Sequence, residues 1–100
     1  MLRAIIIGAE PDLAGKLEQA FEQSERFVSL RSIERYPSGQ EEARIVRAYA
    51  PQVVFLCTDK LEEALRVAAA IEKTVAGVPL VAFGTDPHPQ TLLQLMKAGI

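Results

Sequence analysis

Short aliphatic runs alternate along the chain with longer segments whose apolar residues recur at helical spacing. The aliphatic runs have the length of strands, and several stop at a glycine or follow a proline, a pattern typical of strands buried on both faces of a parallel sheet. Strands are predicted at residues 4–7, 27–33, 53–57 and 80–83. Helices are predicted at residues 11–21, 39–50, 61–75 and 90–98. The second strand is the weakest of the predicted strands, because Arg31 interrupts its apolar pattern.

The predicted helix boundaries carry local signals. Ser38 and Glu41 have the spacing of a capping box, which predicts a helix start near residue 39. Asp59 and Glu62 have the same spacing before the third helix, and Asp59 is predicted to be its N-cap. Gly77 is predicted to end that helix, because glycine readily adopts the left-handed conformation that closes helices.

The alternation of strands and helices predicts the fold class. Strands separated by helices of this length need crossover connections, so the sheet should be mostly parallel with helices on both faces. The predicted class is therefore α/β, a doubly wound parallel sheet. Such sheets bind ligands beyond the carboxyl ends of their strands, near the point where the strand order reverses. Function is accordingly expected at residues 8–10, 34–35, 57–59 and 84–86.

Length, charge and cysteine content narrow the function further. One hundred residues suffice for one domain with a single core. A formal net charge of −2, with both signs mixed along the chain, predicts no binding to nucleic acid or to a membrane surface. The first apolar run stops at Gly8, too early for a signal peptide, so a cytoplasmic domain is expected. The single cysteine, Cys57, excludes an internal disulfide and a cysteine-based metal site.

Four segments carry, in order, the motifs of one known family. They are an aliphatic strand that leads into Glu-Pro, a proline-led strand that ends in cysteine, a proline-led strand that ends in Gly-Thr, and a helix end of the form Lys-Ala-Gly-Ile. They lie at residues 5–11, 51–57, 78–85 and 95–100. Together these segments resemble the receiver domain of bacterial response regulators, and the resemblance spans the whole chain. It implies a flavodoxin-like (βα)5 fold.

The resemblance also shows where this chain departs from an active receiver. It implies that an aspartate after the third strand accepts a phosphoryl group, and that an acidic pair after the first strand helps to hold Mg²⁺. Here Cys57 stands at the phospho-acceptor position, and Gly8 and Ala9 replace the acidic pair, with Glu10 as the remaining carboxylate nearby. The chain is therefore expected to be a degenerate pseudo-receiver with no catalytic residue, metal or other cofactor.

The later positions depart from the family as well. Receivers carry Thr or Ser after the fourth strand, whereas this chain has Gly84, with Thr85 one residue later. The fifth strand and its lysine have no counterpart in the 100 residues, so we expect a single, C-terminally truncated domain that spans residues 1–100 as a (βα)4 unit. Its expected role is regulation in signal transduction by protein–protein contact, not enzyme catalysis.

Two alternative functions stay open. An authentic receiver could use Asp59 as phospho-acceptor, with Glu10 and Asp59 as ligands of Mg²⁺. That assignment needs a register slipped by two residues, about 6–7 Å along a strand. A redox-responsive domain could instead use Cys57, because a strand-end thiol near helix N-termini can have a lowered pKa.

The expected partners are proteins. A sheet without its fifth strand and helix leaves an unpaired edge strand and apolar surface, which predicts a homo-oligomer. A fused output domain is the other expected partner, because similar atypical receivers occur at the N-termini of pilus-assembly localisation ATPases. In that case the catalytic part of the protein lies outside this chain.

Overall fold

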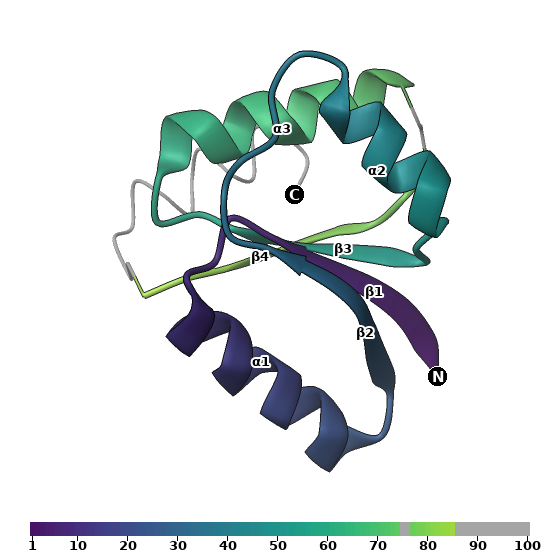
Figure 1. Cartoon of the computed structure of the whole chain (residues 1–100), viewed down its shortest axis with the longest axis vertical. Coiled ribbons are helices and arrows are strands. Elements are labelled where there is room, and N and C mark those ends of the chain that lie inside the picture. Colours follow the sequence, from purple (N-terminus) through teal and green to yellow (C-terminus); the bar gives the residue numbers. More distant parts are fainter. Residues whose placement is uncertain (75–76, 86–100) are drawn as a thin grey trace.

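The computed structural model describes residues 1–74 and 77–85. Within them, four strands alternate with three helices in the predicted order (Figure 1). The strands are β1 (Leu2–Ile7), β2 (Phe27–Ile33), β3 (Val53–Cys57) and β4 (Leu80–Phe83). The helices are α1 (Pro11–Ser24), α2 (Glu41–Tyr49) and α3 (Leu61–Thr74). The predicted helix at 90–98 lies outside the described residues, as does Val75 at the predicted end of α3.

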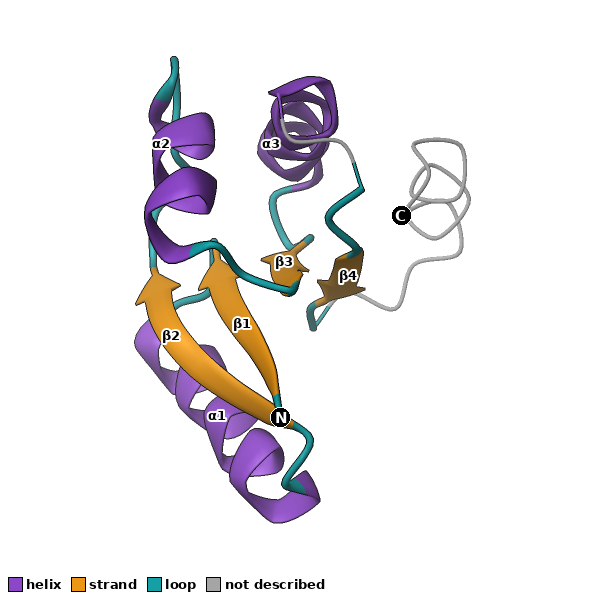
Figure 2. Ribbon diagram, turned by 90° about the vertical axis from the view of Figure 1, so that its right-hand side faces the viewer, coloured by secondary structure: helices purple, strands orange, loops and turns teal. Residues whose placement is uncertain are grey.

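The described strands form one all-parallel sheet in the order β2-β1-β3-β4 (Figure 2). The chain moves outward from β1 to β2 and then returns past β1 to β3 and β4, so the strand order reverses between β1 and β3. α1 covers one face of the sheet, and α2 and α3 cover the other (Figures 1 and 2). The predicted doubly wound α/β class is confirmed, with a flavodoxin-like strand order.

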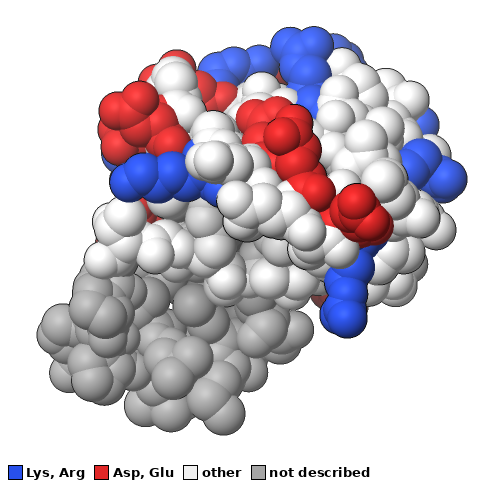
Figure 3. Space-filling view, turned by 90° about the horizontal axis from the view of Figure 1, so that it is seen from below, with Lys and Arg blue, Asp and Glu red and all other residues white. Residues whose placement is uncertain are grey.

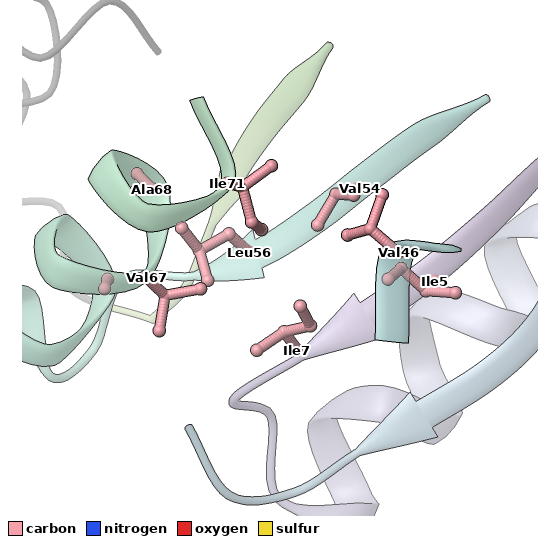
Figure 4. Packing of buried hydrophobic residues seen from close by; sticks show 9 residues of the cluster. Ile5, Ile7, Val46, Val54, Leu56, Val67, Ala68 and Ile71 are labelled. Carbon is pink, nitrogen blue, oxygen red and sulfur yellow. The ribbon is translucent and has the colours of Figure 1, made fainter. Parts of the chain in front are cut away.

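The central strands send alternate side chains into two separate cores. Ile5 and Ile7 of β1 face α2 and α3, where they pack with Val54 and Leu56 of β3 and with Ile71 of α3 (Figure 4). All five side chains are fully buried. Burial of each such side chain stabilises the fold by roughly 1.5–3 kcal/mol. This aliphatic layer is what makes the runs in β1 and β3 so clear in the sequence.

The opposite core, which α1 covers, is largely aromatic. Phe21 of α1, Phe27 of β2 and Phe55 of β3 form a three-ring cluster with centroid separations of 4.9 and 5.2 Å. The edge-to-face contact of Phe27 and Phe55 is a geometry that aromatic quadrupoles favour. In the sequence, Leu13, Leu17, Ala20 and Phe21 have the spacing of one helical face, which predicts that Ala20 is buried. This prediction is wrong, because Ala20 is exposed. Ala14 is buried instead, because the face that carries Phe21 turns Ala20 toward solvent.

The interruption of the second apolar run corresponds to a β-bulge. The pairing of β2 with β1 shifts by one residue between Ala4 and Ile5, so that Leu30 has no partner residue on β1. Just past it, Arg31 reaches toward α2, where its guanidinium donates a hydrogen bond to the Tyr49 hydroxyl at 3.0 Å. The residue that breaks the apolar pattern thus links the edge strand to α2.

The start of α2 differs from the prediction. The helix begins at Glu41, and its N-cap is Gln40, with no side-chain hydrogen bond at the cap. The predicted N-cap at Ser38 is therefore wrong. The Glu41 carboxylate accepts two hydrogen bonds from the Arg35 guanidinium, at 2.6 and 3.1 Å. The Arg35 guanidinium lowers the pKa of Glu41, and the backbone of Ser38, which still interacts with the carboxylate, helps to lower it. The Glu41 side chain is thus paired with the loop that precedes α2.

The surface seen from the α1 side carries both signs of charge (Figure 3). Acidic and basic groups lie next to one another there, and neither sign forms a continuous field over the described residues of this face. In the part of the chain that the structure describes, no helix has both the length and the apolar content that crossing a membrane requires.

Candidate functional site

A depression opens at the carboxyl ends of β1 and β3, at the switch point of the sheet. Its volume is about 460 Å³, and residues that follow β1, β2 and β3 form its walls. Six residues of the predicted strand-end segments line it together, namely Gly8, Glu10, Glu34, Arg35, Cys57 and Asp59. The expectation that the strand ends would bring these residues together is confirmed.

A glycine and an aromatic ring form part of this depression. Gly8 follows β1 in a left-handed conformation, with a φ of 84°, which glycine adopts at little cost. A Cβ atom at this position would lie only 2.5 Å from two ring carbons of Tyr36. The ring therefore rests against the backbone of Gly8 and fills the space in which a side chain at position 8 would stand.

A hydrogen bond across the depression fixes the Tyr36 side chain. The Tyr36 hydroxyl donates to the carbonyl oxygen of Cys57 at 2.6 Å, and so links the loop after β2 to the end of β3. Burial raises the pKa of Tyr36 above its ordinary value, because desolvation disfavours the phenolate. The hydroxyl therefore stays protonated, and able to donate, throughout the physiological pH range.

Cys57, at the predicted phospho-acceptor position, is a buried thiol. Its exposed fraction is 2%, and it packs in the core beneath α1. Burial raises the pKa of Cys57 above its ordinary value. The lowered pKa on which the redox alternative depends is not found, and a raised pKa disfavours the thiolate that nucleophilic and redox cysteines need.

Asp59 holds the segment that follows β4. One of its carboxylate oxygens accepts a hydrogen bond from the Thr85 backbone N–H at 2.7 Å, and the other accepts one from the Thr85 hydroxyl at 2.9 Å. The predicted N-cap role of Asp59 is wrong, because the backbone carbonyl that accepts the first helical hydrogen bond, from Ala64, belongs to Lys60. The carboxylate binds across to the neighbouring strand end instead.

The alternative acceptor and the switch position therefore meet at the ends of β3 and β4. Gly84 allows this approach, because a Cβ atom there would lie 2.6 Å from Oδ1 of Asp59. Thr85, one residue beyond the predicted position, supplies the hydrogen bonds. The structure thus joins Asp59, Gly84 and Thr85, whereas the Cys57 side chain lies in the α1 core.

Further contacts hold the loop between β2 and α2. Arg35 pairs with Glu41 at the start of α2, and this hydrogen-bonded guanidinium lowers the pKa of Glu41. Arg66 of α3 donates to the backbone carbonyl of Pro37 at 3.1 Å. The same Arg66 nitrogen lies 3.4 Å from the carboxylate of Glu42, a side chain on α2 that is almost fully buried. α3 therefore braces both the loop and α2.

The depression lacks a complete set of oxygen ligands for the magnesium ion. Mg²⁺ is usually bound through one or two protein carboxylates. Gly8 and Ala9 supply none, and both carboxylate oxygens of Asp59 are engaged by Thr85. Glu10 is exposed at the N-cap of α1. Among the described residues, no three His, Cys, Asp or Glu side chains are grouped so as to hold a metal ion. The residues present do not fit the magnesium site considered from the sequence.

Tyr36 is the residue of this site that sequence reasoning misses. It lies in a polar loop, where no hydrophobic period identifies a partly buried aromatic side chain. The usable signal is the glycine at the end of β1, since a strand end without a side chain leaves room for a ring from elsewhere. Which aromatic residue fills that room depends on the path of the loop, which the sequence pattern does not predict.

In comparisons with known proteins, no family model and no curated protein matches the chain. The assignment of a function therefore rests on the site itself. Its defining features are the Tyr36 ring seated on Gly8 and the Asp59 carboxylate held by Thr85.

Proposed function

We propose that the chain is a regulatory, receiver-like domain of the cytoplasm that acts by contact with other proteins and without phosphoryl transfer. The observation that carries this proposal is the position of the Tyr36 ring, which lies over Gly8. In the receiver family that the sequence resembles, the acidic pair belongs at this strand end. A phenol ring in its place is compatible with a signalling domain that has lost phosphorylation chemistry.

Electrostatics support the same proposal. Transfer of a phosphoryl group to a carboxylate relies on a metal ion and fixed cationic groups that stabilise charge in the transition state. At the three positions where the receiver family carries carboxylates, this chain offers a glycine, a buried alanine and a buried thiol whose pKa is raised by burial. None of these side chains is an oxygen ligand for a hard cation.

A small acyl-phosphate donor tests this proposal. The protein is incubated with acetyl phosphate and Mg²⁺, and its intact mass is measured by mass spectrometry. We expect no phosphoryl adduct on the wild-type protein. An adduct that forms on the wild type and is lost in an Asp59→Ala variant would overturn the proposal.

The second candidate, a magnesium-dependent receiver that uses Asp59, is favoured by one observation. The Thr85 hydroxyl lies 2.9 Å from a carboxylate oxygen of Asp59, so an acceptor and a hydroxyl donor stand side by side at neighbouring strand ends. If this candidate is correct, Thr85→Ala slows the formation of the adduct. If our proposal is correct, neither the wild type nor Thr85→Ala forms one.

The redox alternative is tested on Cys57 directly. Because the thiol is buried and its pKa is raised, we expect iodoacetamide to alkylate the folded protein slowly near neutral pH. The same protein in urea should be alkylated quickly, which provides the control for reagent activity. Equally fast alkylation of the folded and unfolded protein would support a reactive cysteine and count against an inert one.

The partner that we propose for this contact is a second copy of the chain at the outer edge of β2. Val28 and Leu30 of this edge strand are 39% and 37% exposed, and an uncovered strand edge with apolar side chains favours association. A Glu-Arg pair precedes the strand at residues 25–26, and another follows it at residues 34–35. Two β2 strands that approach in antiparallel orientation therefore bring glutamates of one copy toward arginines of the other.

Sedimentation velocity over a range of protein concentrations tests the proposed contact. We expect a concentration-dependent dimer that is weakened by Leu30→Lys on β2. Val81→Lys is the matched control, because Val81 is 40% exposed on β4, at the opposite edge of the described sheet. A monomer at high micromolar concentration would contradict the self-association, and an equal effect of both substitutions would contradict its location at β2.

A further inference from the structure

The depression at the switch point has the features of a pocket for an aromatic alcohol. Gly8 provides a flat seat, because it has no side chain where the Tyr36 ring lies. Leu13 of α1 adds an apolar wall. The Cys57 carbonyl accepts the ring hydroxyl at 2.6 Å. The apolar seat is confined to Gly8 and Leu13, because the rest of the depression is lined by charged residues, namely Glu10, Glu34, Arg35, Asp59, Lys60 and Glu63.

The seat and the ring come from different parts of the chain. The seat is built from the ends of β1 and β3, whose buried side chains fix them in the sheet. The ring is carried by the loop that follows β2, in which Glu34 and Arg35 are exposed. The ion pair of Arg35 with Glu41 is exposed too, and exposed pairs hold a segment weakly. The contacts that hold the ring on its seat are therefore separate from those that hold the sheet together.

Anchoring contacts hold the chain on both sides of the segment that carries Tyr36. Pro37 is buried, and its carbonyl accepts a hydrogen bond from Arg66 of α3. Residues that follow Pro37 are thus fixed to the helical layer, and residue 33 is fixed in β2. The segment between these anchors is short, residues 34–36, and it carries the ring.

We propose that Tyr36 is a displaceable occupant of an aromatic-binding site, and that the seat on Gly8 takes a phenolic ring, such as a tyrosine side chain of a partner protein, when residues 34–36 swing away. This inference rests on the proposed function, because it names the side chain through which a protein partner other than the second copy at β2 engages the domain. It also places the site where open α/β sheets bind ligands. Tyr36 then acts as an autoinhibitory contact, since the partner's ring and the resident ring compete for one seat.

Phenol is the probe that tests the seat. In a Tyr36→Ala variant, we expect phenol to raise the melting temperature and to shift NMR signals of residues around Gly8, with a dissociation constant of about 1 mM. Wild-type protein should show neither effect at the same phenol concentration. Toluene should bind more weakly than phenol, because it has no hydroxyl to donate to the Cys57 carbonyl.

Tyr49→Ala is the matched control. Tyr49 is also partly buried, and its hydroxyl also takes part in a hydrogen bond, but it lies on α2 and outside the walls of the depression. We expect no phenol binding to this variant. Phenol that fails to bind folded Tyr36→Ala, or that binds Tyr49→Ala equally well, would overturn the aromatic site.

A second measurement covers the case in which Tyr36→Ala does not fold. The chain has two tyrosines and no tryptophan, so Tyr49→Phe leaves Tyr36 as the single tyrosine fluorophore. In that background Gly8→Ala should push the ring off its seat and increase its quenching by acrylamide. Unchanged quenching would overturn the proposal.

The two proposals can fail separately. An adduct with acetyl phosphate overturns the phosphorylation-independent function and leaves the phenol result as it stands. Loss of phenol binding in a folded Tyr36→Ala variant overturns the aromatic site and leaves the mass measurement unchanged.

Discussion

Two regions of the molecule are held together by different interactions. One is the body, meaning the buried central strands β1 and β3 with the helices packed on them. The other is the mouth, meaning the strand ends and loops around Gly8, Tyr36, Asp59 and Thr85. In the body, Ile7 and Leu56 are fully buried among aliphatic neighbours. Such a layer requires apolar residues of suitable volume more than particular partners. At the mouth, one ring sits on Gly8 and one carboxylate binds Thr85, each contact joining residues far apart in sequence. The body therefore supplies stability, and the mouth can rearrange or be replaced without loss of the fold.

The largest effect is expected in the body. Leu56→Ala removes a fully buried side chain from the aliphatic core and leaves a cavity, which should lower the free energy of unfolding by about 2–5 kcal/mol. Urea unfolding followed by circular dichroism measures this change. Val81→Ala, on the exposed face of β4, is the control and should change it by less than about 1 kcal/mol. Similar losses in the two variants would contradict the assignment of stability to the central strands.

A series of glycine variants tests how much the contacts of the mouth contribute to stability. Gly8→Ala places a Cβ against the Tyr36 ring in a left-handed backbone, and we expect a loss of about 1–3 kcal/mol in unfolding free energy. Gly39→Ala is matched for backbone, since Gly39 has a φ of 67° and no described atom within 4 Å of the point where a Cβ would stand, so it isolates the cost of conformation. The difference between the two variants therefore reports the contact with the ring.

One variant of the same series should raise the free energy of unfolding instead of lowering it. Gly15 lies within α1, with open space around it and no left-handed backbone, so Gly15→Ala should stabilise the protein by about 0.5–1 kcal/mol. Combining Gly8→Ala with Tyr36→Ala should restore part of the loss caused by Gly8→Ala. Strictly additive effects of these two substitutions would show that the ring and the glycine do not interact.

The sequence predicts the body of the sheet better than it predicts the mouth. β2, β3 and β4 have the predicted ends, and the α/β class is confirmed. Continuous apolar runs, as in β3, report burial directly. The N-caps predicted at Ser38 and Asp59 are wrong. In both cases the acidic side chain has another partner, the nearby Arg35 for Glu41 and Thr85 at the neighbouring strand end for Asp59.

The sequence predicts where the site lies, but it does not predict which side chains fill it. Parallel strands place their carboxyl ends at one edge, so the positions of Gly8, Cys57 and Asp59 follow from the strand assignment. That Tyr36 covers Gly8 depends on the path of a loop, and that path is determined by contacts such as Arg66 with Pro37. Contacts of this kind have no periodic signature in the sequence.

Asp59→Ala tests the second anchor of the mouth. The substitution removes both hydrogen bonds to Thr85, and we expect a loss of about 1–2 kcal/mol because the carboxylate is charged but exposed. Amide hydrogen exchange should become faster at Thr85 and remain slow in β1. Faster exchange throughout β1 would show that Asp59 belongs to the stabilising body and not to the mouth alone.

Tyr36→Phe should have a smaller effect. The ring stays on Gly8, and only the hydrogen bond to the Cys57 carbonyl is lost, so a loss of about 0.5–1.5 kcal/mol is expected in urea unfolding. Phenol should still be excluded, because the seat remains filled. Phenol binding to Tyr36→Phe would mean that the hydroxyl, and not the ring, keeps the site closed.

The smallest effect is expected from the ion pair of Arg35 with Glu41, which joins the mouth to α2. The hydrogen-bonded guanidinium lowers the pKa of Glu41 in the folded protein, so this stabilisation is present above the ordinary glutamate pKa of about 4.3 and is lost as the pH falls. Wild type and Glu41→Gln should therefore differ in stability near neutral pH and converge in acid. The difference should also shrink in about 1 M salt, where the Debye length is about 3 Å.

The same variant links this weak contact to the movement of the ring. If the ion pair restrains residues 34–36, Glu41→Gln in the Tyr49→Phe background should increase the quenching of Tyr36 by acrylamide while stability hardly changes. The body of the sheet gives the opposite pattern, in which Leu56→Ala lowers stability but leaves the quenching of the folded state unchanged. A change in quenching without a change in stability would separate the two regions, because it identifies a contact that controls access to the site and contributes little to the fold.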